Sequence, residues 1–281
     1  MTPEPSAYDG PVGIRAPFAI LAADHGRPLE DMLAGHGLPS GPEAQRAFKA
    51  DLVDAVGADA SAVLLDPDVS LPALRDSVRT DLLVRIEADD VELADGLRRT
   101  QMVPDLGAEG ARRLGADAAK LMVFVRADRA DEYPLQLVRE VLADCRRADL
   151  PCVVELMTYR LVDESPQAFA ARHEDLVVDG AVALEESGAE VLKLEYPGSA
   201  AACRRVTDAL SVPWAVLSAG VDHEAFRDQL REAVDGGAAG FIAGRSVWKE
   251  AVGLPADERR AFLQDTARRR FAELVDMVAA A

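Results

Sequence analysis

The stretch Val191-Leu192-Lys193-Leu194-Glu195 is short and largely apolar, and such a run predicts a buried strand. Eight runs of this kind follow one another along the chain, at residues 18–23, 61–65, 82–86, 118–125, 152–156, 190–194, 214–217 and 240–243. Segments with helical spacing separate them or follow the last, among them residues 42–56, 224–234 and 256–278. Alternating strands and helices predict parallel strands with right-handed crossovers. Eight such units over 281 residues favour an α/β fold of the (β/α)8 (TIM) barrel class over an open doubly wound sheet.

The same pattern indicates the domain organisation. Between residues 87 and 110 the chain is polar and irregular, so periodicity alone leaves the number of units open between seven and nine. No linker rich in proline, glycine or serine divides the chain. We therefore expect an N-terminal leader over residues 1–17 and a single barrel domain with its C-terminal helix over residues 18–281. The charge clusters at residues 87–92 and 257–260 are expected to be solvated faces.

The composition excludes several classes of function. A net charge of −18 disfavours general affinity for nucleic acids or anionic membranes, because both would be repelled at long range. The three cysteines have no CxxC spacing and predict neither a disulfide framework nor a zinc site. The sequence shows no signal peptide and no run of 18 apolar residues, so a cytoplasmic protein is expected.

Sequence motifs for common cofactors are missing as well. The chain has no GxGxxG, P-loop or GxSxG motif. Its four histidines lack the spacing of a metal site: His25, His36, His173 and His223. We therefore expect neither a cofactor nor a metal.

Lysine is rare in this chain, and two lysines lie in unusual places. Lysine and arginine together number 31, yet only four of these residues are lysines. Lys120 and Lys193 lie inside apolar runs, where burial disfavours the charged form and lowers the pKa of the amine. A lysine of this kind is the nucleophile that a Schiff-base enzyme needs. The alternative is that both amines reach solvent or pair with buried carboxylates such as Glu155 and Glu195.

Charged residues follow or interrupt four of the predicted strands: Asp24, Lys120, Glu155 and Lys193. The last three interrupt the fourth, fifth and sixth strands, which are neighbours in a barrel. Strand residues alternate between the barrel interior and the helix layer, and active sites form at the C-terminal ends of the strands. If the side chains point inward, each ammonium lowers the pKa of the other amine. One lysine is then the nucleophile, the other holds substrate oxygens as a cation, and the carboxylate moves protons. Asp24 could equally cap its strand.

Small residues follow the last two predicted strands. Ser218 and Gly220 come after the seventh strand, and Gly244 and Arg245 come after the eighth. Small residues let backbone N–H groups approach a ligand, and in barrels the loops after strands seven and eight commonly bind phosphate. We therefore predict an anion site here, with Arg245 as its cation. His25 follows the first strand, where it either touches the substrate or is solvated.

Taken together, these segments resemble the class I aldolases of the tagatose 1,6-bisphosphate aldolase family. Within that family the chain looks closest to the 6-deoxy-6-sulfofructose-1-phosphate aldolases. The resemblance spans residue 18 to the C-terminus and is carried by seven segments: AADHGRP from Ala22, SAVLLDPD from Ser61, KLMVFVRAD from Lys120, VELMTY from Val154, VLKLEYP from Val191, PWAVLSAGVDHEAF from Pro213 and GAAGFIAGRSVWKEAVGLP from Gly237.

The resemblance implies a metal-independent (β/α)8 barrel that reversibly cleaves a ketose 1-phosphate to dihydroxyacetone phosphate and an aldehyde. It implies Lys193 as the Schiff-base lysine and Glu155 as the proton shuttle, with Lys120 and Asp24 as supporting polar groups. It also implies that the substrate's C1 phosphate binds at four residues: Ser218, Gly220, Gly244 and Arg245. The implied partner is a small phosphorylated, and in one branch sulfonated, ketose, and the implied assembly is a homo-oligomer.

The loop after the first strand departs from the family pattern. The family has Asp-Gln-Arg at this place, whereas this chain has Asp24-His25-Gly26-Arg27, with the arginine one place later. The loop approaches the distal end of the substrate in such a barrel, so the second substrate group stays open between a phosphate, a sulfonate and neither. Two other functions also stay open: a transaldolase that uses the same lysine, and a barrel that binds a sugar phosphate without chemistry.

Overall fold

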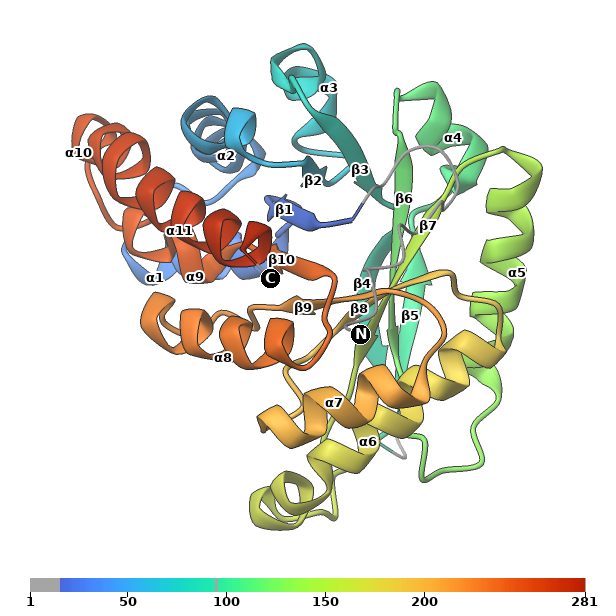
Figure 1. Cartoon of the computed structure of the whole chain (residues 1–281). Helices are drawn as coiled ribbons and strands as arrows, with labels where there is room; N and C mark the ends of the chain where they lie inside the picture. Colours follow the sequence, from blue (N-terminus) through green and yellow to red (C-terminus); the bar gives the residue numbers. More distant parts are fainter. Residues whose placement is uncertain (1–15, 94–95, 281) are drawn as a thin grey trace.

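A computed structural model of the protein describes residues 16–93 and 96–280 (Figure 1). Of the predicted leader over residues 1–17, all but the last two residues lie outside this part of the chain.

Eight parallel strands form the centre of the molecule. They are β1 (Phe18–Ala22), β2 (Ala62–Leu65), β3 (Asp81–Arg85), β6 (Ala118–Phe124), β7 (Cys152–Met157), β8 (Val191–Leu194), β9 (Trp214–Leu217) and β10 (Gly240–Ala243). They close into a barrel in the order β1-β10-β9-β8-β7-β6-β3-β2. The predicted (β/α)8 class and the single domain are therefore confirmed.

Helices surround the strands (Figure 1). They are α1 (Arg27–Gly35), α2 (Pro42–Val56), α3 (Leu71–Leu74), α4 (Gly107–Arg113), α5 (Tyr133–Arg147), α6 (Pro166–Glu186), α7 (Ala200–Ala209), α8 (His223–Asp235), α9 (Arg245–Trp248), α10 (Ala256–Phe262) and α11 (Arg268–Ala279). Two of them begin at a serine whose hydroxyl caps the first turn: Ser165 accepts from the Ala168 N–H, and Ser199 accepts from the Ala202 N–H. The predicted C-terminal helix is α10, a π-helical turn (Leu263–Ala267) and α11, and it packs against α2 and α8.

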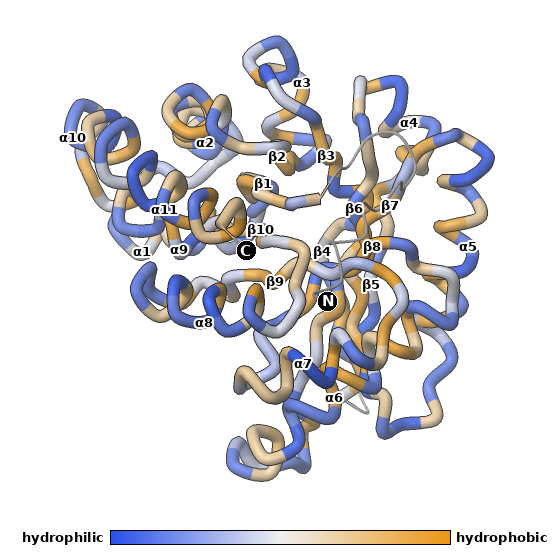
Figure 2. The backbone as a smooth tube through the Cα atoms, in the orientation of Figure 1, coloured by the Kyte–Doolittle hydropathy of each residue, from blue (hydrophilic) through white to orange (hydrophobic). Residues whose placement is uncertain are grey.

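Apolar side chains form two layers, one inside the barrel and one between the strands and the helices. The interior layer consists of Phe18, Ile20, Ala22, Ala62, Leu64, Leu83, Ala118, Val153, Val191, Ala215 and Ile242. The residues between them on each strand, such as Leu192 and Leu194, face the helices. Figure 2 accordingly shows hydrophobic residues concentrated on the strands, while each helix alternates between hydrophobic and hydrophilic residues. Lys193 shares the parity of Val191, so its side chain belongs to the interior set.

The irregular third unit contains an antiparallel hairpin of β4 (Glu87–Glu92) and β5 (Arg98–Met102) outside the barrel sheet. Thr100 in β5 donates a hydrogen bond to the Met122 carbonyl at 2.9 Å, which fixes the hairpin to β6. The expectation that residues 87–92 form a solvated face is wrong at its first residue, since Glu87 is fully buried. None of the described helices is long and apolar enough to span a membrane.

Candidate active site

A cavity of about 510 Å³ opens where the barrel strands end. All ten residues singled out in the sequence line it: Asp24, His25, Arg27, Lys120, Glu155, Lys193, Ser218, Gly220, Gly244 and Arg245. The inward direction of Lys193 is thus as predicted, and the structure brings this amine into one cavity with Arg245. The distances and charges among these side chains determine which chemistry the site can perform.

Lys193 and Glu155 are opposite each other on neighbouring strands, β8 and β7. The two side chains are buried, and Lys193 Nζ lies 2.9 Å from Glu155 Oε1. Burial alone would raise the pKa of Glu155, but the charges of Lys120 and Lys193 outweigh it and hold this pKa below its ordinary value. Glu155 is therefore a carboxylate that can take a proton from an adjacent amine or substrate.

Lys120 is enclosed by three carboxylates from three elements. Its Nζ lies 2.8 Å from Glu155 Oε2 and 3.2 Å from Asp24 Oδ2, and it also donates to Glu87 at the start of the hairpin. Burial disfavours the ammonium, yet the attraction of Glu155, Glu87 and Asp24 is larger and raises the pKa of Lys120. The prediction that the two amines lower each other's pKa is therefore wrong for Lys120. This side chain stays a cation at neutral pH.

Asp24 and His25 follow β1 and line the cavity. Burial would raise the pKa of Asp24, but Lys120, His25 and Lys193 lower it well below its ordinary value. The His25 ring packs edge-on against Trp248, with 5.2 Å between the ring centroids. Burial lowers the pKa of His25 to about 3, although Asp24 opposes this shift. His25 is thus a largely buried neutral imidazole and not a solvated loop residue.

The loops after β9 and β10 form a narrow cradle beside Arg245. Gly220 has φ +76°, and a Cβ there would lie 3.1 Å from Arg245 Cζ. A Cβ on Gly244 would lie only 2.7 Å from the Ala22 carbonyl oxygen. Both positions therefore need glycine. Arg245 Nε is buried and has no hydrogen-bond partner among the described residues, so the guanidinium is available to an anion at the lining of the cavity.

Lys249 holds the loop after β9 in place. Its Nζ donates to the Gly220 carbonyl at 3.0 Å and pairs with Asp222 Oδ1 at 2.6 Å. The buried Ser218 faces the same cavity, close to the backbone of Gly244. The cradle thus combines a hydroxyl, backbone that a ligand can approach closely, and one guanidinium. Donors of these kinds suit a phosphate.

Two further arginines line the cavity. Arg27 is the first residue of α1, and Arg85 is the last residue of β3. The Arg85 guanidinium lies beside Gly26, where a Cβ would be 3.8 Å from its Nη2 atom. Asp90 also lines the cavity but is paired with Arg98 in the hairpin. Arg27 and Arg85 therefore add two cations to the lining besides Arg245, which suits a substrate with a second anionic group.

Two charged lining residues were missed in the sequence, Arg85 and Glu87, and Glu195 was named there only as a carboxylate that could pair with a lysine. Arg85 and Glu87 continue the inward parity of Leu83 on β3, and Glu195 continues that of Lys193 on β8. Extending the two-residue alternation past each strand end would have found them. Among the described residues, no group of three or more histidine, cysteine, aspartate or glutamate side chains is arranged to hold a metal ion.

Comparisons with known proteins agree with this geometry. A model of the DeoC/LacD family aldolases matches residues 18–250. Tagatose 1,6-diphosphate aldolase 2 of Streptococcus pyogenes serotype M3 is 26% identical, with 86% of this chain and 83% of that protein covered. The family match confirms the wider resemblance inferred from the sequence motifs. The narrower resemblance to the 6-deoxy-6-sulfofructose-1-phosphate aldolases stays a prediction.

Two solved structures share the fold. A fructose-bisphosphate aldolase from Plasmodium falciparum, in complex with TRAP and a small-molecule inhibitor, has a TM-score of 0.71 at 15% identity and covers 95% of this chain and 91% of that chain. A Schiff-base-forming fructose-1,6-bisphosphate aldolase has a TM-score of 0.65 at 21% identity and covers 92% of this chain and 93% of that chain. At these identities the likeness concerns the barrel alone.

Proposed function

Because the chain belongs to the DeoC/LacD aldolase family and is therefore an aldolase, a lyase of carbon–carbon bonds, we propose that it cleaves a phosphorylated ketose through a Schiff base on Lys193. The products are dihydroxyacetone phosphate and an aldehyde, and the reaction is reversible. The proposal includes no metal ion, because the iminium on Lys193 supplies the electron sink.

One observation carries the proposal: a buried lysine amine lies in the cavity 2.9 Å from a carboxylate and faces the same space as Arg245. The amine has only Glu155 as a close carboxylate partner in the described ion pairs, whereas Lys120 has three. Lys193 is therefore the amine that can lose its proton, to Glu155, and attack a carbonyl.

The remaining residues are assigned from their positions. The Lys193 amine adds to the C2 carbonyl, Glu155 carries the protons that convert the carbinolamine to an iminium and water, and Lys120 holds substrate oxygens as a permanent cation. The C3–C4 bond then breaks, and its electron pair moves toward the iminium nitrogen to give an enamine. Hydrolysis of the resulting iminium, after a proton has returned to C3, releases the product and restores the amine.

The cations of the cavity suggest the class of substrate. The cradle of Ser218, Gly220, Gly244 and Arg245 suits the C1 phosphate, as the resemblance implies. Arg27 and Arg85, which line the same cavity, suit a second anion. Tagatose 1,6-bisphosphate, with a phosphate there, and 6-deoxy-6-sulfofructose 1-phosphate, with a sulfonate there, are the two substrates that we propose to compare.

The test is a direct assay of cleavage. Purified protein dialysed against EDTA is given each ketose, and the dihydroxyacetone phosphate released is followed by its coupled reduction. We expect turnover of at least one substrate, undiminished by EDTA, and none by the Lys193→Met variant. Appreciable cleavage by Lys193→Met, or activity that EDTA removes and a divalent metal restores, would overturn the proposal.

A further inference from the structure

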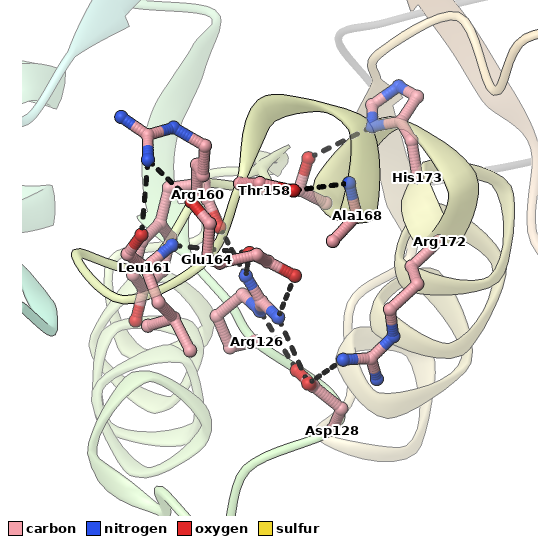
Figure 3. A network of polar contacts seen from close by, with 11 residues as sticks. Arg126, Asp128, Thr158, Arg160, Leu161, Glu164, Ala168, Arg172 and His173 are labelled. Carbon is pink, nitrogen blue, oxygen red and sulfur yellow. Dashed lines mark hydrogen bonds and ion pairs between the residues drawn. The ribbon is translucent and has the colours of Figure 1, made fainter.

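A chain of polar contacts leads out of the cavity beside Lys193. Glu195 lines the cavity, Thr158 follows β7, and His173 lies on α6. Glu195 Oε2 accepts hydrogen bonds from the Thr158 N–H at 2.7 Å and from the Thr158 hydroxyl at 2.8 Å. The Thr158 hydroxyl also lies 3.3 Å from His173 Nδ1, as Figure 3 shows, and His173 Nε2 lies 3.2 Å from the Tyr196 carbonyl oxygen. These contacts connect the cavity to the helix layer.

An ion network around the buried Arg126 holds the elements of this chain in place (Figure 3). Arg126, two residues after β6, donates to Asp128 at 2.8 Å and to Glu164, in the loop after β7, at 2.6 Å. Asp128 also pairs with Arg172 at 2.8 Å, and Arg172 directly precedes His173 in α6. The loop that carries Thr158 and the helix that carries His173 are therefore tied to the same arginine. Their approach to each other is thus a fixed feature of the barrel rim.

Counting hydrogens shows what the contacts require. The Tyr196 carbonyl can only accept, so His173 Nε2 must carry a hydrogen. The Thr158 hydroxyl has a single hydrogen, which it donates either to Glu195 or to His173 Nδ1. In the first case Nδ1 must be protonated to bond the hydroxyl, and in the second case Glu195 must be protonated. All four contacts form together only when Glu195 and His173 carry, between them, one proton more than an ionised carboxylate and a neutral imidazole.

We propose that Glu195, Thr158 and His173 form a proton relay, in which Glu195 is a further catalytic residue and the other two are positioning residues. This inference rests on the proposed function, in which the substrate is bound to Lys193. Glu195 follows Lys193 by two residues and has the same inward parity, about 7 Å nearer the mouth along an extended chain. It therefore faces the part of the substrate beyond the carbon that is joined to the amine.

The relay takes up and later returns the proton that moves during cleavage. As the C3–C4 bond breaks, the C4 hydroxyl gives its proton to the Glu195 carboxylate, the O–H electron pair forms the aldehyde carbonyl, and the C3–C4 pair forms the enamine. The group enters this step as a carboxylate and a neutral imidazole. It then holds the C4 proton on Glu195 or, through Thr158, on His173 Nδ1, and in either form all four contacts are satisfied. After the aldehyde leaves, this proton returns through Glu195 to C3 and the enamine becomes an iminium again. Protons and electrons balance without a further reactant.

The charges around Glu195 suit this exchange better than those around Glu155. The titratable groups that face Glu195 are Lys193 on its own strand, Glu155 on β7 and His173 on α6. Burial raises the pKa of Glu195, and the hydrogen bonds from Thr158 reduce that rise without cancelling it. A carboxyl group with a raised pKa exchanges protons closer to neutral pH. Glu155 lies between the side-chain nitrogens of Lys120 and Lys193, its pKa is lowered, and it serves the amine end of the substrate.

The test compares near-isosteric variants in two assays. One follows kcat for cleavage against pH, and the other follows exchange of the hydroxymethyl proton of dihydroxyacetone phosphate with D2O by NMR. We expect Glu195→Gln to slow both processes by about 100-fold or more, as for loss of a general acid or base. Thr158→Val should shift the acid limb of the kcat profile to higher pH, because Glu195 loses a hydrogen bond that favours its charged form. Thr158→Ser restores the hydroxyl and should keep the wild-type profile, and so should Asp179→Asn, at an exposed site on α6 outside the network.

Borohydride trapping of dihydroxyacetone phosphate on Lys193 separates the two proposals, because it needs only the amine. Trapping that persists in Glu195→Gln and Thr158→Val, together with slowed exchange, supports the relay and shows that both variants are folded. Trapping together with wild-type exchange rates and an unchanged pH profile would overturn the relay and leave the proposed function standing. No trapping in the wild-type protein would overturn the proposed function itself.

Discussion

Glu155 and Lys193 face each other across neighbouring strands, with 2.9 Å between Oε1 and Nζ, while the second oxygen of the same carboxylate lies 2.8 Å from Lys120 Nζ. One carboxylate therefore touches an amine that can be the nucleophile and another that stays charged. This arrangement separates nucleophile from cation although both are buried lysines, on the two strands that flank β7.

Replacing Glu155 with glutamine keeps the shape of the side chain but removes the base next to Lys193. We expect kcat for ketose cleavage to fall by about 100-fold or more, because proton transfer at the carbinolamine loses its carrier. Steady-state kinetics with a coupled assay measures this. A kcat close to the wild-type value would show that another group carries these protons.

Replacing Lys120 with methionine removes the one basic group that the three carboxylates share, and Lys193 remains only at Glu155. We expect the free energy of unfolding at neutral pH to fall by about 3–5 kcal/mol, as for a buried ion pair that has lost one partner. The deficit should shrink as the pH falls, because the carboxylates are then neutralised. Urea unfolding at several pH values measures both effects. Arg139→Met removes an exposed pair with Glu132 and should cost about 1 kcal/mol or less, so an equal loss in both variants would contradict the account.

His25 makes the stability of the protein depend on pH. Burial lowers its pKa to about 3, below its value in the unfolded chain, so unfolding takes up a proton at intermediate pH. The contribution is complete above the unfolded pKa of about 6.5 and is lost as the pH falls toward 3. The wild type should therefore lose up to about 1.4 kcal/mol more per pH unit than His25→Gln in this window. Parallel slopes for the two proteins in urea unfolding would contradict this; His36→Gln, at an exposed site, is the control.

Replacing Gly220 with alanine tests the anion cradle. The new Cβ would lie 3.1 Å from the Arg245 guanidinium carbon and should displace it, raising KM for the phosphorylated ketose by about 10-fold, or about 1.4 kcal/mol. Gly198→Ala is the matched control, since Gly198 also has a positive φ, +115°, but open space around it. Both variants should lose about 1–3 kcal/mol of stability from backbone strain. Equal KM values in the two variants would mean that Arg245 does not hold the substrate.

The strand pattern predicted the barrel because its eight apolar runs are bounded by polar residues. The same alternation predicted that Lys193 and Glu155 meet inside, since residues of like parity on adjacent strands share a face. The hairpin at residues 87–102 was not predicted, because its strands are polar and are fixed by long-range contacts such as Thr100 to the Met122 carbonyl. Glu87 was therefore expected in solvent although it is buried.

The charge state of the site could not be predicted from the sequence either. Two lysines on the strands that flank β7 suggested mutual repulsion, but the pKa of Lys120 depends on Glu155, Glu87 and Asp24, which come from three separate elements. Lys49, on α2, is a second lysine whose partner could not be predicted: it is buried and pairs with Asp66, which follows β2. Pairing of this kind follows from tertiary contacts that periodicity does not encode.

The central claim is that the amine of Lys193 reacts with the substrate carbonyl, and reductive trapping tests it most directly. The protein is incubated with dihydroxyacetone phosphate and borohydride, and the adduct is located by peptide mass mapping. We predict a single added three-carbon unit on the peptide that contains Lys193, and none in Lys193→Met. An adduct on Lys120 or Lys49, or no adduct under conditions in which cleavage proceeds, would contradict the account.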